Sequence, residues 1–114
     1  PAELEYQVTL MEHRVVELVR APEQPIHQAG DNLLVDFDLS ETALPAGTRL
    51  RVGGALLRVS AEPHAGCHKF RARFGDGALQ WVNAREHRPL RLRGINCRIL
   101  ESGPVRVGDP IVIE

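Results

Sequence analysis

The sequence predicts an α+β domain built on a β-barrel or a strongly curved, mostly antiparallel sheet, with two or three short helices inserted. Short apolar stretches recur from Asn32 onward, turn residues separate them, and a few segments show the helical spacing of apolar residues. The length of 114 residues suits one core, so we expect residues 1–114 to form a single domain.

The first thirty residues predict a strand, a helix and a loop. Alternation of apolar and polar residues favours a strand around Tyr6, Val8 and Leu10. Thr9 and Glu12 have the spacing of a capping box, which would start a helix there. One apolar helix face then follows at Met11, Val15, Leu18 and Val19. We expect this helix to end near Arg20, and residues 21–30, with two prolines, to form a loop.

The remaining elements are short strands and two short helices. Gly53 and Gly54 mark a two-residue hairpin, because both glycines accept positive φ. Helices are expected just after Cys67, from the spacing of Phe70 and Phe74, and from about 77 to 85 with Asp76 as its cap. Strands are expected at residues 33–37, 48–52, 55–60, around Leu90 and Leu92, and at 95–100, 105–107 and 111–113.

Composition limits the classes of protein. The chain is 43% hydrophobic and 25% charged, as in soluble globular proteins, and no apolar run approaches the roughly 20 residues of a membrane span. The start of the chain lacks the basic and apolar regions of a signal peptide, so we expect a cytoplasmic protein without membrane contact. A net charge of −1 argues against nucleic acid as a partner, and two cysteines do not form a disulfide framework.

Charge is distributed unevenly along the chain. Residues 67–98 contain eight basic and two acidic residues, a balance of about +6, whereas the remainder has six basic and thirteen acidic residues, about −7. A local site for an anionic small molecule is one interpretation. The other is that arginines such as Arg91, Arg93 and Arg98 are solvated or pair with the acidic half.

Cys67 is the candidate reactive residue. It lies between His64 and His68 and ahead of three basic residues, Lys69, Arg71 and Arg73, in a predicted loop-to-helix junction. Nearby cations and a first helical turn lower the pKa of a thiol and favour the thiolate. The alternative is a buried structural cysteine, which free cysteines often are. Structural zinc on the two histidines and Cys67 is disfavoured, because adjacent ligands cannot easily share one tetrahedral ion and no second cluster completes the set.

An ordered series of short motifs resembles the MOSC domain, the C-terminal domain of molybdenum-cofactor sulfurases. The motifs are Gly30-Asp31-Asn32-Leu33, Asp38-Leu39, residues 45–53 and 55–59, Cys67-His68-Lys69-Phe70, Phe74-Gly75, Arg93-Gly94 and residues 98–109. The resemblance covers roughly residues 30–114. The Gly-Asp and His segment that MOSC domains usually carry upstream is not matched, so we expect a short variant lacking it. Gly66 stands where the family often has proline before the cysteine.

The resemblance implies a MOSC-like β-barrel and places Cys67 on the family's characteristic cysteine. That cysteine is proposed to carry persulfide sulfur or, where molybdenum is bound, to ligate the metal. A molybdopterin-type cofactor is then implied, or none, with a cysteine desulfurase or a molybdoenzyme as partner. Lys69, Arg71 and Arg73 would contact the anionic pterin or lower the thiol pKa, and Asp31 and Asn32 would shape the pocket.

A second interpretation is a non-enzymatic module that keeps the barrel and binds an anion or a protein without chemistry. The sequence alone leaves open whether the protein is an enzyme. If the missing upstream segment leaves a sheet edge unpaired, homodimerisation is one way to cover that edge.

Overall fold

The computed structural model describes the backbone of residues 2–114 and the side chains of residues 4–114, and Pro1 lies outside the described residues. Its strands are β1 (Val8–Glu12), β2 (Leu33–Val35), β3 (Arg49–Val52), β4 (Ala55–Pro63), β5 (Ile95–Glu101) and β6 (Ile111–Ile113). Its α-helices are α1 (His13–Val19), α2 (His68–Phe74) and α3 (Asp76–Asn83). Three 3₁₀ segments complete it: η1 (Ala2–Tyr6), η2 (Ile26–Ala29) and η3 (Arg85–Leu90).

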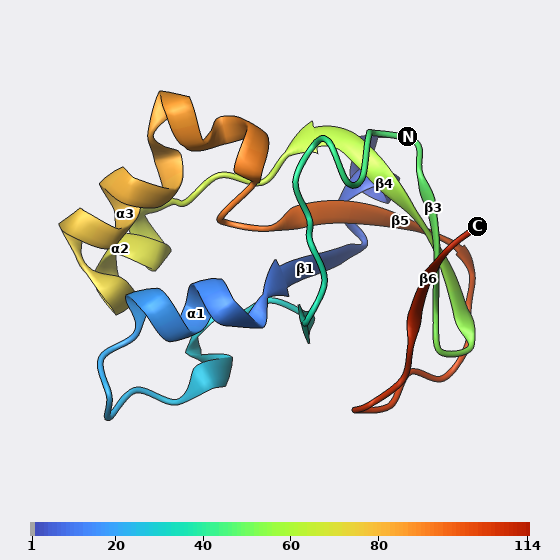
Figure 1. The fold of residues 1–114 in the computed structure, drawn as a ribbon, viewed down its shortest axis with the longest axis horizontal. Coiled ribbons are helices and arrows are strands. Elements are labelled where there is room, and N and C mark those ends of the chain that lie inside the picture. The colour runs from blue at the N-terminus through green and yellow to red at the C-terminus, as the bar shows by residue number, and fades with distance from the viewer. Residues whose placement is uncertain (1) are drawn as a thin grey trace.

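The six strands form one mixed sheet in the order β2-β1-β5-β4-β3-β6. β1 and β2 are parallel, and the other four neighbouring pairs are antiparallel. The sheet curls into a half-barrel, with the helices gathered at one end of the molecule (Figure 1). Among the described residues the edge strands β2 and β6 do not pair with each other, so the sheet does not close into a full barrel. The predicted α+β class with a strongly curved, mostly antiparallel sheet is confirmed.

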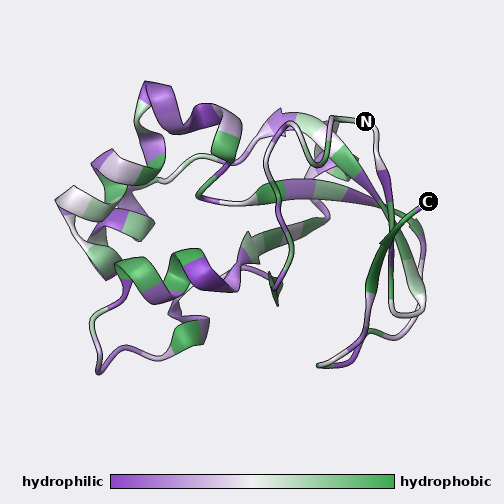
Figure 2. Ribbon diagram, in the orientation of Figure 1, coloured by the Kyte–Doolittle hydropathy of each residue, from purple (hydrophilic) through white to green (hydrophobic). Residues whose placement is uncertain are grey.

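Strand β1 separates two apolar cores. Successive strand residues point to opposite faces, so Leu10 packs with the half-barrel residues while Met11 packs with the helices. The half-barrel core includes Leu50, Leu57 and Cys97, and the helical core includes Val16, Phe70 and Val82. Figure 2 shows the apolar residues that line α1 and β1, where the two cores adjoin. This arrangement places α2 and α3 against the end of the sheet where β4 finishes and β5 begins.

Glycines permit two tight contacts within the sheet. Gly53 has φ 54° in the predicted β3–β4 hairpin, whose two-residue turn is confirmed, although only Gly53 of the pair has positive φ. Gly94 has φ 112° just before β5, and a Cβ there would lie 2.2 Å from the Leu10 carbonyl oxygen. Gly94 therefore lets the start of β5 pass directly against β1.

Five local predictions are wrong. Thr9 lies inside β1 and α1 begins only at His13, because pairing of β1 with β5 extends the backbone through the predicted capping box. Gly75, rather than Asp76, is the residue before α3. Leu90 ends η3 and Leu92 lies within a turn, and residues 105–107 contain no strand, because neither segment has a strand partner. Residues 26–29 of the predicted loop form η2.

No helix among the described residues is both long enough and apolar enough to cross a membrane.

Candidate functional site around Cys67

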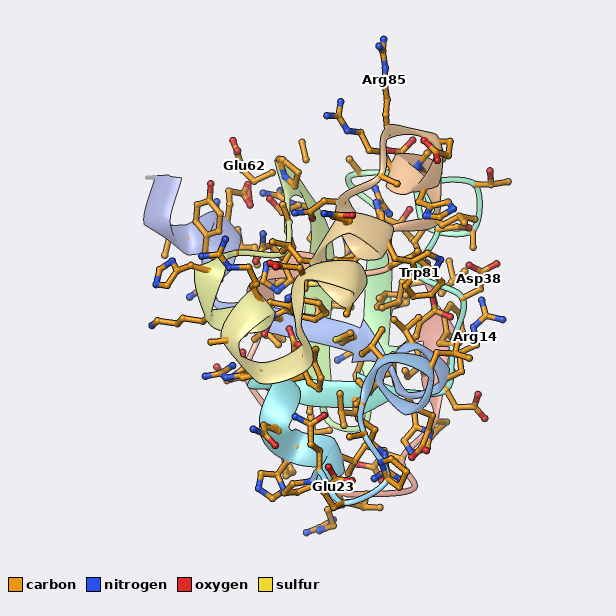
Figure 3. All side chains as sticks on the ribbon, turned by 90° about the vertical axis from the view of Figure 1, so that its left-hand side faces the viewer. Arg14, Glu23, Asp38, Glu62, Trp81 and Arg85 are labelled. Carbon is orange, nitrogen blue, oxygen red and sulfur yellow. The ribbon has the colours of Figure 1, made fainter. Side chains whose placement is uncertain are left out.

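Cys67 lies at the junction of a four-residue loop, residues 64–67, with helix α2. The loop leaves the end of β4 at Pro63, and Cys67 is exposed and precedes the first helical residue, His68. Helix α2 forms because its seven residues lack proline and glycine, and it docks through the buried Phe70, whose ring centroid lies 4.9 Å from that of Phe74. The predicted loop-to-helix position of Cys67 is confirmed. Figure 3 views the molecule from this helical end.

The surroundings of Cys67 favour its thiolate. The pKa of the thiol is lowered, first by the backbone N–H groups of Phe70 and Lys69 and then by the positive charges of Arg93 and Lys69. Partial burial acts in the opposite direction and is outweighed. The Cys67 side chain is exposed, so the sulfur is open to solvent.

The other cysteine has the opposite properties. Cys97 is fully buried in β5, and burial raises the pKa of its thiol to about 12. It is a small apolar member of the half-barrel core. Only Cys67 of the two therefore suits thiol chemistry.

A buried ion pair lies behind α2. Arg93 donates to Asp31 Oδ2 at 2.6 Å, and His64 Nε2 lies 3.1 Å from Asp31 Oδ1, while the Asp31 side chain has no exposed surface. The Arg93 guanidinium carbon lies 5.3 Å from the centre of the Phe70 ring, in the range of a cation–π contact. Burial alone would raise the pKa of Asp31, but His64 and Arg93 more than compensate and lower it. The pair thus connects the loop before Cys67 with the core under α2.

The peptide before Cys67 is held from the other side by α3. Asn83 Oδ1 accepts a hydrogen bond from the Gly66 N–H at 2.8 Å, and Asn83 Nδ2 donates to the Gly66 carbonyl at 3.0 Å. His64 and Gly66 are therefore both anchored, each to a different part of the fold.

A pocket of about 490 Å³ opens beside this loop. Its wall includes His64 and Ala65 of the loop, Asn83 of α3, and the carboxylates of Glu41 and Glu62. Three arginines also line it, Arg88, Arg91 and Arg93. Arg91 is engaged by the backbone, since it donates to the Leu44 carbonyl at 2.6 Å, and Arg93 is engaged by Asp31. Arg88 is exposed on the wall and is available to a ligand.

The three basic residues predicted for the site lie along α2. Lys69 is exposed next to Cys67. Arg71 is also exposed and lies 3.7 Å from Asp76 across the turn into α3. Arg73 is half-buried and donates to the Ala29 carbonyl at 3.1 Å. Lys69 is therefore the most accessible of the three cations to a ligand near Cys67, whereas Arg73 packs against the chain itself.

The two predicted pocket-shaping residues separate in the structure. Asp31 lies under the Cys67 loop and contacts His64, but its carboxylate is enclosed by protein. Asn32 Oδ1 accepts from the Thr9 N–H at 2.9 Å, and Asn32 lines pockets near β2 rather than the one beside the Cys67 loop. Direct ligand contact by either residue stays a prediction.

Asn83 and the contacts of Arg93 were not identified from the sequence. Arg93 stood only in the basic segment and in a short motif, and no spacing rule relates it to Asp31, 62 positions away. Asn83 carried no signal at all, since a polar residue near a helix end is ordinary. Among the described residues, no group of three or more His, Cys, Asp and Glu side chains is arranged to hold a metal ion.

Comparison with protein families decides the relationship of this chain. The model of the MOSC domain matches residues 4–112. The chain belongs to the MOSC domain family. The match begins well before Gly30, so the MOSC domain includes β1 and α1, which the sequence motifs did not cover. The family is associated with molybdenum-cofactor sulfurase-like function.

Solved structures similar to this MOSC domain support the fold. YiiM from Geobacillus stearothermophilus has a TM-score of 0.71 at 21% identity, over 96% of this chain and 55% of that one. YiiM from Escherichia coli has a TM-score of 0.67 at 21% identity, over 97% of this chain and 55% of that one. YuaD from Bacillus subtilis has a TM-score of 0.61 at 22% identity, over 94% of this chain and 63% of that one. The MOSC domain thus spans just over half the length of the YiiM structures. A search of the curated proteins finds no match.

Proposed function

We propose that this MOSC domain carries sulfur on Cys67, in a reducing, cytoplasmic compartment. The observation that supports the proposal is an exposed thiol of lowered pKa at the position where the family motif has its cysteine. Cys97, buried and of raised pKa, does not qualify. A cysteine desulfurase is the proposed sulfur donor and a molybdoenzyme the proposed acceptor.

The proposed transfer conserves atoms and electrons. The Cys67 thiolate attacks the outer sulfur of a donor persulfide, the donor S–S bond breaks, and a new S–S bond forms on Cys67. The donor leaves as a thiolate, and the sulfane sulfur keeps its proton. The N–H groups of Phe70 and Lys69 and the charge of Arg93 favour the anionic attacking form, and they equally favour the anionic persulfide.

A molybdopterin-type cofactor is the proposed alternative occupant. A single exposed thiolate fits a cofactor that brings its other metal ligands with it, in agreement with the lack of a metal-binding cluster among the described side chains. Cys67 would hold the metal, and Lys69, Arg71 or Arg73 would face the anionic pterin. When bound, the cofactor would supply redox chemistry at molybdenum.

The test is sulfur loading followed by intact-mass measurement. Incubation with a cysteine desulfurase and cysteine is expected to add one sulfur atom, which dithiothreitol removes. Cys67→Ser should abolish the addition, while Cys97→Ala, the matched cysteine control, should retain it. Sulfur addition that persists in Cys67→Ser would contradict the proposal. Metal analysis of protein from a molybdopterin-competent host tests the cofactor alternative.

A second candidate function is anion binding without chemistry, favoured by the arginine-lined pocket beside the loop. Inorganic phosphate is the probe, titrated by calorimetry at two salt concentrations. This function requires that Arg88→Ala weakens binding in a salt-dependent way while Cys67→Ser leaves it unchanged. Equal loss in both variants would argue against it.

A further inference from the structure

Gly66, the residue that precedes Cys67, has both of its backbone polar groups bound by one side chain. The Gly66 N–H and carbonyl pair with the Asn83 carboxamide at 2.8 and 3.0 Å, which closes a ring of two hydrogen bonds. Asn83 is the last residue of α3, so its position is fixed by a helix that packs through Val82 into the helical core. A loop peptide is therefore held by a rigid element.

Glycine at position 66 leaves room for this pairing. A Cβ there would lie 2.9 Å from Leu79 Cδ1 and 3.0 Å from Val82 Cγ2, so α3 lies directly against the backbone. Proline at this position would also lack the N–H that Asn83 accepts from.

The other hydrogen bonds of the loop lie at its two ends, so the pairing of Gly66 with Asn83 is the contact that fixes the backbone just before Cys67. At the upstream end, Asn96 donates to the Pro63 carbonyl at 3.3 Å and His64 contacts Asp31. At the downstream end, the Cys67 carbonyl accepts from the Arg71 N–H at 3.0 Å within α2. Between them, the Gly66 peptide sets the backbone direction from which the Cys67 side chain projects. Its described hydrogen bonds are those to Asn83.

We propose that Asn83 is a positioning residue for Cys67, holding the backbone of Gly66 so that the Cys67 side chain keeps its place at the start of α2. The inference rests on the proposed function of Cys67, since it assigns Asn83 a part in presenting that thiol. Asn83 acts through the loop, whose residue Gly66 it binds.

The test is the pH profile of Cys67 alkylation by iodoacetamide in Asn83→Ala. Losing the clamp lets the sulfur move away from the N–H groups, so the midpoint is expected to rise by about half a unit to one unit. The alkylation rate at pH 7 then falls roughly three- to tenfold, while the limiting rate at high pH is retained. Ala is a better helix former than Asn, so α3 itself is not weakened. Gln80→Ala, which removes an exposed amide from the same helix, should leave the profile unchanged.

An Asn83→Ala profile equal to that of the wild-type protein would overturn the proposal. A measurement without mutation provides a second test: the Gly66 amide of the native protein should exchange its hydrogen slowly, and exchange at the rate of a free loop amide would also overturn it. The proposed function fails separately. A protein that takes no sulfur from a desulfurase, yet shows the Asn83→Ala shift, refutes sulfur carriage and retains the positioning role.

Discussion

Asp31 is ionised although protein encloses it completely. Burial disfavours its charge, but contacts with His64 and Arg93 outweigh that effect and hold its pKa below the ordinary range. A buried pair of this kind adds little over an apolar pair of the same shape, but removing one partner leaves the other charge uncompensated. Loss of Asp31 would therefore leave the buried charge of Arg93 without a partner, beneath the helix that follows Cys67.

Asp31→Asn should lower the free energy of unfolding by about 3 to 5 kcal/mol at pH 7, because Arg93 keeps its charge in a buried site. Urea unfolding measures the change. The matched control is Asp76→Asn, which breaks the exposed pair with Arg71 and should cost no more than about 1 kcal/mol. Equal effects of the two substitutions would contradict the assignment of Asp31 to a buried, stabilising pair.

The same pair predicts a pH dependence. A carboxyl whose pKa is lower in the folded state stabilises the fold above its unfolded pKa, roughly 3.9, and loses that contribution as pH falls through the lower folded value. The difference in stability between wild type and Asp31→Asn should therefore be full above about pH 5 and shrink below about pH 4. Urea unfolding of both proteins at a series of pH values between about 3 and 7 measures this difference in stability.

At the scale of elements, α2 depends on one anchor. Phe70 is 1% exposed, contacts the Phe74 ring in a tilted arrangement and lies beneath Arg93, whereas the flanking residues of the helix face solvent. Seven residues do not form a stable helix alone, so tertiary packing must supply the stability. Phe70 thereby determines whether Cys67 has a helix behind it.

Phe70→Ala should cost about 3 to 5 kcal/mol, as expected for a truncated core aromatic. Leu18→Ala on α1, where Leu18 is 71% exposed, is the control and should change stability by no more than about 0.5 kcal/mol. Thermal unfolding followed by circular dichroism compares them. A loss at Phe70 no larger than that at Leu18 would mean that α2 is not anchored through this ring.

The sequence was sufficient where local chemistry decides the structure. Gly53 and Gly54 specified a hairpin, and Pro63, Gly66 and the two phenylalanines placed Cys67 before a helix. It failed where partners distant in the chain decide. Thr9 had good capping chemistry, yet pairing with Asn96 in β5 made it part of a strand. The contacts of Asp31 with Arg93 and of Gly66 with Asn83 likewise depend on the assembled fold.

At the scale of the molecule, the two cores should unfold together. Leu10 and Met11 are adjacent residues of β1, and both are fully buried, one in each core. Loss of either core therefore removes part of the burial that holds β1 in place. This coupling favours the predicted single domain, residues 1–114, over two independently stable halves.

Leu50→Ala in the half-barrel core and Val16→Ala in the helical core should each shift one common unfolding transition. Far-ultraviolet circular dichroism follows the whole backbone, and fluorescence of the single tryptophan, Trp81, follows the helical core. The two signals should give coincident midpoints in both variants. Separate midpoints in either variant would show that the cores unfold independently.

The place of β1 in the sheet also affects how the chain acquires its fold. β1 comes near the beginning of the chain, but its partner β5 comes near the end, so that Val8 pairs with Cys97 and Leu10 with Ile95. Pairing of such distant positions requires the closure of a large loop, and the entropy lost in closing it slows folding. During synthesis, β1 and the β3–β4 hairpin must wait for β5 to join them. A ribosome-bound chain ending before Ile95 would hold two unfinished pieces of the sheet, and the surface around Cys67 would form among the last.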